Sequence, residues 1–168
     1  DGYKRQARRS TCFRRSIGAI IIRDDQIIST GYVGAPRKTK DSLEHGFCLR
    51  DRLNIPHGQR YELCRSVHAE QNAIINAARA GVSLRGGDIY IYGSRPGKEQ
   101  PIDAYPCFIC KKMIINAGIK RVICNTKDNR IRTFDVSQWV KDWQEKDMLD
   151  DLDIYDAKYH EVEKQAKK

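Results

Sequence analysis

The sequence lacks any long apolar run, since nowhere do eighteen or more apolar residues follow one another. That is about the length that a membrane-spanning helix needs. The N-terminus also lacks the charged and then apolar layout of a secretory signal peptide. These absences predict a protein that neither crosses nor is targeted to a membrane and that works in the cytoplasm. Because the chain starts at Asp1 and not at a methionine, we expect a leader or an opening helix to have preceded it.

Internal repeats and clustered aromatic residues are also missing. The eight tyrosines and four phenylalanines gather on no evident strand, which weighs against a stacking platform for single-stranded nucleic acid. With 168 residues, of which 40% are hydrophobic, the chain is long enough for one good core and too short for two. We therefore expect one compact domain over residues 1–146, followed by a charged tail or an appended helix over residues 147–168.

Charge is abundant and unbalanced, with 31 Lys and Arg against 22 Asp and Glu and a formal net charge of +9. A basic surface attracts phosphate-bearing partners, which leaves both a free nucleotide and a nucleic acid open. Six cysteines in a chain expected in the cytoplasm favour a metal site or catalysis over disulfides, because reducing compartments keep thiols free.

Alternating strand and helix patterns predict an α/β fold in which helices pack on a mixed sheet. The expected strands are residues 16–22, 26–32, 88–92, 121–125 and 130–134. The expected helices are residues 67–80, ended by Gly81, residues 107–117, opened by Pro106 and ended by Gly118, and a last one capped by Ser137. Residues 34–42 and 93–105 are expected to be loops, and residues 43–65 give no clear signal.

Metal-ligating residues stand in the first turns of two predicted helices. His68 and Glu70 begin the alanine-rich helix, and Cys107 and Cys110 begin the next one, where their spacing places both thiols on one face. If the two helix ends meet, one imidazole and two thiolates provide three of the four ligands of a tetrahedral zinc. A fourth position left to water is typical of a catalytic zinc site. Glu70 would then carry a proton from that water to a substrate nitrogen.

Each of these motifs has a plainer interpretation when taken alone. A His-x-Glu triplet is usually a surface accident, and a Cys-x-x-Cys motif at a helix start also suits a thiol redox site. Both motifs at predicted helix starts, with Pro106 directly before the first cysteine, form a far more specific signature.

The motifs His68-Ala69-Glu70 and Pro106-Cys107-Phe108-Ile109-Cys110 resemble the signature of the zinc-dependent cytidine deaminase superfamily. Further stretches within residues 9–123 are similar to its deoxycytidylate (dCMP) deaminase branch, namely RSTCFRR, IGAIII, ISTGYVGAP, ELCRSVHAEQNAII and KKMIINAGIKRVI. The resemblance implies a three-layer fold, with a mixed five-stranded sheet and helices on both faces. It also implies zinc on His68, Cys107 and Cys110, with Glu70 as the proton shuttle. The implied reaction is hydrolytic deamination at C4 of cytosine, turning dCMP into dUMP and ammonia.

Further expectations follow from the resemblance. Members of the branch are usually homo-oligomers, and many are regulated by deoxynucleoside triphosphates. Substrate contacts are expected at Val33, Ala69 and Pro106, although Val33 replaces an asparagine that the family uses for the sugar. The loop over residues 93–105 is longer than the branch usually has, so a lid or an altered substrate choice is open.

A second metal site is also implied. Cys12, Cys48 and Cys64 match positions at which some members hold a structural zinc, with His45 or His57 as the fourth ligand. Buried structural thiols remain the alternative interpretation. Cys124, inside a predicted strand, is expected to be a core residue.

Three classes of function stay open at this point. Deamination of a free cytosine nucleotide is favoured. The first alternative is a deaminase that acts on a base in RNA or single-stranded DNA, where the +9 charge would follow a phosphate backbone. The second is a non-catalytic, zinc-stabilised binding module, to which Val33 lends weight. Glu70 argues against that module, because a structural zinc has no use for a non-ligating carboxylate beside it.

Overall fold

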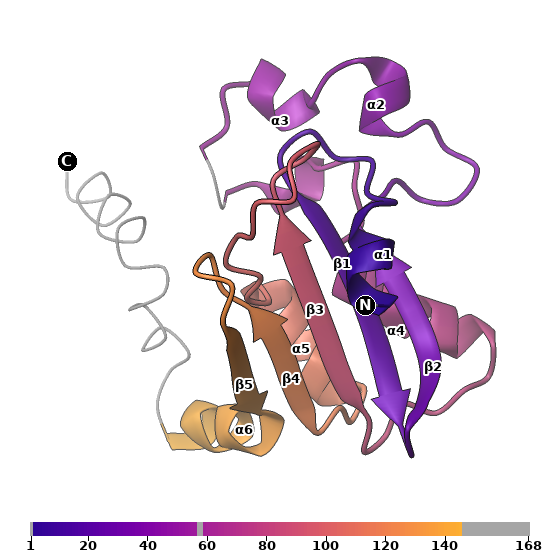
Figure 1. The fold of residues 1–168 in the computed structure, drawn as a ribbon, viewed down its shortest axis with the longest axis vertical. Coiled ribbons are helices and arrows are strands. Elements are labelled where there is room, and N and C mark those ends of the chain that lie inside the picture. Colours follow the sequence, from indigo (N-terminus) through magenta and orange to yellow (C-terminus); the bar gives the residue numbers. More distant parts are fainter. Residues whose placement is uncertain (1, 57–58, 146–168) are drawn as a thin grey trace.

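The computed structural model describes residues 2–56 and 59–145. Its centre is a five-stranded sheet in the order β2-β1-β3-β4-β5 (Figure 1). The strands are β1 (Ser16–Arg23), β2 (Gln26–Tyr32), β3 (Asp88–Ser94), β4 (Arg121–Asn125) and β5 (Ile131–Asp135). β3 and β4 are parallel, and the other neighbouring pairs are antiparallel. The mixed five-stranded sheet is therefore confirmed.

Helices cover both faces of this sheet, which confirms the three-layer prediction. In Figure 1, α1 (Gly2–Ala7) lies in front of the sheet, whereas α4 (Ala69–Arg79) and α5 (Phe108–Asn116) lie behind it. Beyond one end of the sheet lie α2 (Ser42–His45), α3 (Leu49–Arg52) and the 3₁₀ helix η1 (Tyr61–Leu63), and α6 (Val136–Glu145) follows β5. Gly81 and Gly118 have φ angles of 66° and 71° and end α4 and α5 as predicted.

The hairpin of β1 and β2 closes in a two-residue turn, and the start of β1 sets the length of β3. Asp24 and Asp25 have φ angles of 51° and 59°, which is the left-handed backbone that a tight two-residue turn requires. The predicted hairpin is confirmed. β3 is two residues longer than predicted, because Gly93 and Ser94 pair with Ile17 and Ser16 of β1.

The strand directions bring the starts of α4 and α5 to the same edge of the sheet. β2 and β3 are each antiparallel to β1, so they are parallel to each other. α4 follows β2 in the chain and α5 follows β3. Helices that follow parallel strands on one face begin near the carboxyl ends of those strands. Although α2, α3 and η1 come between β2 and α4, Val67 pairs with Gly34 just after β2, so α4 also begins near the carboxyl end of its strand and the two N-termini lie near each other.

A close approach of α4 to β2 sets how near the start of this helix lies to the sheet. A Cβ atom at Gly31 would lie 2.2 Å from the carbonyl oxygen of Ala69, so only glycine leaves room for the helix here. Ser29 Oγ donates to the carbonyl oxygen of Ala73 at 2.6 Å. The apolar core fills the remaining space between the sheet and the helices, and Cys124, 1% exposed, belongs to it as predicted.

Both helix starts were predicted slightly too early. His68 and Cys107 have extended backbones, with ψ angles of 155° and 168°, and are the N-cap residues of α4 and α5. Pro106 therefore precedes the cap and does not open the helix. The prediction that Ser137 caps the last helix is wrong, since Asp135 Oδ1 accepts a hydrogen bond from the Ser137 N–H at 2.9 Å and takes that role.

The segment without a sequence signal forms three short helices, and α2 already begins at Ser42, inside the predicted loop. His57 and residues 146–168 lie outside the described residues, so the predicted tail and the domain boundary beside it stay predictions. Of the helices in the described part of the chain, none is long and apolar enough to cross a membrane.

Asn125, at the end of β4, closes the base of the long loop between β3 and α5. Its Oδ1 accepts a hydrogen bond from the Gly93 N–H at 2.8 Å. Its Nδ2 donates to the carbonyl oxygens of Gly93 at 3.1 Å and Ile102 at 3.0 Å. Residues 95–100 project beyond this clamp as a turn. The clamp ties down the chain shortly before Cys107 and so fixes where α5 begins.

Replacing Asn125 with alanine is expected to lower the free energy of unfolding by about 2 kcal/mol, because the Gly93 N–H and the Ile102 carbonyl oxygen lose the hydrogen bonds that Asn125 makes to them. Asn125→Asp should be no better, because a carboxylate cannot donate to the two carbonyl oxygens. Urea unfolding measures the change. The control is Gln138→Ala, which removes an exposed amide in α6 and is expected to cost less than about 0.5 kcal/mol. Equal stability of Asn125→Ala and the wild type would contradict the clamp.

Candidate functional site

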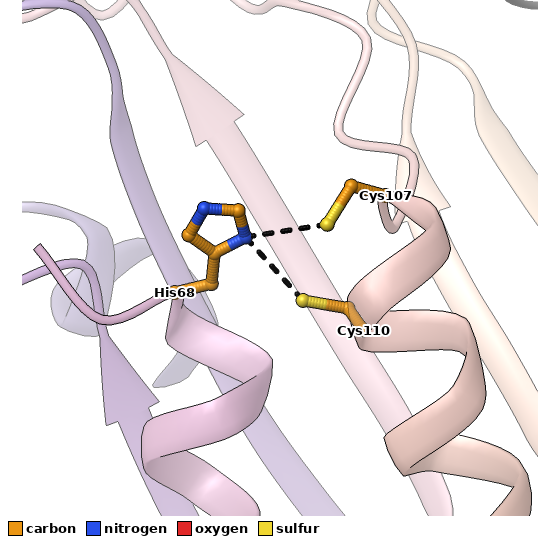
Figure 2. A group of neighbouring side chains, drawn as sticks. All are labelled: His68, Cys107 and Cys110. Carbon is orange, nitrogen blue, oxygen red and sulfur yellow. Dashed lines mark hydrogen bonds between the residues drawn. The ribbon is translucent and has the colours of Figure 1, made fainter. Parts of the chain in front are cut away.

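Three predicted metal ligands meet where α4 and α5 begin. His68 Nδ1 lies 3.5 Å from Cys107 Sγ and 3.4 Å from Cys110 Sγ. Figure 2 shows the imidazole at the tip of one helix facing both thiols on the tip of the other. Among the described residues, this is the only set of three or more His, Cys, Asp or Glu ligand atoms that lie within 4.8 Å of one another.

These distances fit a zinc ion. In a tetrahedral site with zinc–nitrogen bonds of about 2.05 Å and zinc–sulfur bonds of about 2.3 Å, the nitrogen and a sulfur are about 3.6 Å apart. The observed separations of 3.5 and 3.4 Å are close to that value. One imidazole with two thiols is also a donor set that zinc prefers. His68, Cys107 and Cys110 would thus hold the ion and leave one coordination position without a protein ligand.

The electrostatics of the site favour negative charge on sulfur. A hydrogen bond from the Cys110 thiol, together with the hydrogen bond and the charge of His68, lowers the pKa of Cys107 to about 4. The pKa of Cys110 is raised, because its thiol donates to Cys107 and is buried. A bound zinc ion would favour the thiolate form of both sulfurs. The nearby helix N-termini add stabilisation of the thiolate form.

Glu70 lies beside the thiols in the first turn of α4. Its side chain is 5% exposed, and its carboxyl group lies close enough to His68 and Cys110 to affect the pKa values of both. Burial raises the pKa of Glu70 above its usual value. A carboxyl whose pKa moves toward neutrality can both accept and return a proton. Burial alone would lower the pKa of His68, but its hydrogen bond to Cys107 and the charge of Glu70 raise that pKa overall.

The three residues expected to contact a substrate are buried. Val33 is 6% exposed and belongs to the apolar core, where its N–H donates to the Ile17 carbonyl oxygen at 3.0 Å. Ala69 and Pro106 are fully buried and adjoin the predicted metal ligands His68 and Cys107 in the sequence. Their contacts to a substrate stay predictions.

The three cysteines of the second candidate metal site, Cys12, Cys48 and Cys64, lie in one region of the structure. Burial raises the pKa of Cys12, and the charges of Cys64 and Cys48 raise it further. No three of Cys12, Cys48, Cys64 and His45, however, have ligand atoms that all lie within 4.8 Å of one another. None of the three is in a disulfide. His45 contacts Arg65, with His45 Nε2 at 2.9 Å from Arg65 Nη1.

Some residues at the site have no recognisable signal in the sequence. Tyr61, whose ring contacts His68, and Arg50, whose guanidinium covers Tyr61, lie in the segment that gave no pattern. Gln71 Oε1 accepts the His68 N–H at 3.1 Å. Its place three residues after the N-cap is the one sequence signal that was available, because it fits a capping box.

Comparisons with known proteins agree with this geometry. The family model for the cytidine and deoxycytidylate deaminase zinc-binding region matches residues 3–126. The chain is 33% identical to a deoxycytidylate deaminase of Schizosaccharomyces pombe, over 73% of this chain and 34% of that protein. It is 36% identical to ComE operon protein 2 of Bacillus subtilis, over 69% of this chain and 51% of that protein. The chain thus spans between a third and a half of the length of these two relatives.

A solved structure shares the fold. The dCMP deaminase of cyanophage S-TIM5, crystallised with dCMP and dUMP, superposes with a TM-score of 0.52 at 25% sequence identity. The superposition covers 74% of this chain and 76% of that one. The matched region includes His68, Cys107 and Cys110, and the family model is named for zinc binding. The chain therefore belongs to the family of cytidine and deoxycytidylate deaminases and carries its zinc-binding region.

Proposed function

We propose that this chain catalyses the hydrolytic deamination of a cytosine nucleotide, with dCMP as the substrate and dUMP and ammonia as the products. The observation that carries the proposal is a buried glutamate in the first turn of α4, beside an imidazole and two thiols that have the spacing of a zinc site. A structural zinc would not require this carboxylate, so the arrangement favours catalysis.

The roles of the residues follow from their positions. His68, Cys107 and Cys110 would hold zinc, and bound zinc supplies Lewis-acid activation that brings the pKa of a water from about 15.7 toward about 7. Glu70 takes a proton from the attacking water as the bond to C4 of cytosine forms. Glu70 then returns a proton to the amino nitrogen, which leaves as ammonia when the C4–N bond breaks. One carboxylate serves both steps, and its raised pKa suits the transfer in each direction.

The choice of dCMP rests on the named relatives. The S. pombe protein is a deoxycytidylate deaminase, and the superposed cyanophage enzyme was crystallised with dCMP and dUMP. A homo-oligomer, a deoxynucleoside triphosphate effector and a cytoplasmic location are further parts of the proposal, and they rest on the family resemblance.

We also propose a second, structural zinc held by Cys12, Cys48 and Cys64, with His45 or His57 as the fourth ligand. Three buried guanidinium nitrogens in this region have no hydrogen-bond partner among the described residues, namely Arg14 Nη1, Arg50 Nε and Arg65 Nε. Three thiolates around a divalent cation carry a net negative charge, which would offset these surplus donors. Three sulfurs and one imidazole also form a closed set typical of structural zinc.

Ammonia release from dCMP, CMP, deoxycytidine, dCTP and a cytosine-containing oligonucleotide, measured in parallel, tests the proposed function. We expect dCMP to give the highest kcat/KM. Glu70→Gln should retain its zinc but lose about a hundred- to ten-thousand-fold in kcat. The matched control is Glu62→Gln, which changes an exposed glutamate and should leave the rate unchanged.

Two results would contradict this function. Turnover of the oligonucleotide with none of the free nucleosides or nucleotides would assign the chain to nucleic-acid deamination. An unchanged rate in Glu70→Gln would remove the proton shuttle.

Metal analysis of the purified chain tests the second zinc. We expect nearly two zinc ions per chain in the wild type and nearly one in Cys64→Ser, because that variant loses one thiolate of the structural set. Cys124→Ser, which changes a core cysteine, should keep both ions. A wild type with one zinc that Cys64→Ser also retains would show that the three cysteines are structural thiols.

A further inference from the structure

The His68 imidazole is not held by a hydrogen bond on its second nitrogen within the described part of the chain. Nδ1 contacts both thiols, whereas the described residues place no partner on Nε2. The second nitrogen of a metal-binding histidine normally donates to a carboxylate or a carbonyl, which fixes the plane of the ring. Because rotation about the bond between Cβ and the ring is otherwise broad, a different contact has to set that plane here.

The ring that contacts this imidazole is Tyr61, from η1. The ring centroids of Tyr61 and His68 are 5.2 Å apart and the two planes are inclined by 87°. This edge-to-face arrangement is one that aromatic pairs prefer over a face-to-face sandwich. An edge-to-face contact depends on the angle between the rings, so it favours one plane of the imidazole over others.

The Tyr61 ring is in turn contacted by the guanidinium group of Arg50, which lies in α3. The guanidinium carbon of Arg50 lies 4.8 Å from the centroid of the Tyr61 ring. Arg50 is 4% exposed, and its Nη2 donates to the carbonyl oxygen of Pro56 at 3.2 Å. A cation over an aromatic face is attracted more strongly when water is excluded. The stack therefore runs from a buried arginine through a tyrosine to the imidazole.

We propose that Tyr61, backed by Arg50, is a positioning residue that sets the plane of the His68 imidazole so that Nδ1 faces the two thiols. Arg50 in α3 and Tyr61 in η1 thereby act as a support for the metal centre. The inference rests on the part of the proposed function that makes His68 a zinc ligand, and it is independent of the substrate and of turnover.

Zinc retention under a chelator tests this inference, with Tyr61→Leu removing the ring and Tyr61→Phe retaining it. The relevant zinc is identified as the release phase that is missing in His68→Ala. We expect Tyr61→Leu to lower the zinc affinity of this site about ten- to a hundred-fold, which is typical when a group that orients a ligand is lost. Tyr61→Phe should stay close to the wild type. Thermal unfolding of the zinc-free variants is measured in parallel.

Two outcomes of this experiment would overturn the inference. The first is a lower melting temperature in Tyr61→Leu with unchanged zinc retention, because the ring would then serve packing alone. The second is equal loss of zinc in Tyr61→Phe and Tyr61→Leu, because the hydroxyl and not the ring would then carry the effect.

A measurement on the wild type covers the case in which Tyr61→Leu fails to fold. Nuclear Overhauser contacts between the ring protons of Tyr61 and His68 are expected in the zinc-free protein, and their absence would overturn the inference. Ammonia release plays no part in either experiment. A wild type that holds zinc through His68 but deaminates nothing would contradict the proposed function and leave this inference standing.

Discussion

The meeting of two helix N-termini is the constraint on which the whole site depends. His68 is the N-cap of α4, Cys107 is the N-cap of α5, and Cys110 lies in the first turn of α5, so each predicted ligand lies at a helix start whose position the fold sets. The distances from Nδ1 to the two sulfurs match the edges of a zinc tetrahedron without any rearrangement. The opposite pKa shifts of the two thiols and the burial of Glu70 follow from this one arrangement, which would leave one coordination position of a bound zinc without a protein ligand.

The sheet and the loops supply that arrangement from several directions. The parallel relation of β2 and β3 brings both helix starts to one edge. Gly31 lets α4 approach β2 closely, and Asn125 ties down the loop that leads to Cys107. Each device acts on backbone position, and none touches the metal ligands directly. Tyr61 differs, because it contacts the imidazole itself.

The sequence predicted what depends on local pattern and missed what depends on tertiary contacts. β-Branched runs predicted the hairpin, and His68 with the spacing of Cys107 and Cys110 predicted a set of metal ligands whose side chains the structure brings together. The helix starts were predicted too early. His68 and Cys107 are N-cap residues with extended backbones, and the presence of metal-binding side chains in the sequence does not reveal the backbone conformation. Arg50 and Tyr61 lie in short helices held by a buried cation on a ring, and such contacts leave no periodic signal. No pattern in the amino-acid sequence indicated the structural role of Asn125, because its hydrogen-bond partners are backbone groups that are distant from it in the chain.

Anomalous X-ray scattering at the zinc edge, from a crystal of the zinc-loaded protein, tests the central claim most directly, because it places the ion among individual atoms. The account predicts a peak at bonding distance from His68 Nδ1, Cys107 Sγ and Cys110 Sγ, with no fourth protein ligand. A site closed by a fourth side chain, or a disulfide between the two cysteines with no peak beside them, would contradict it.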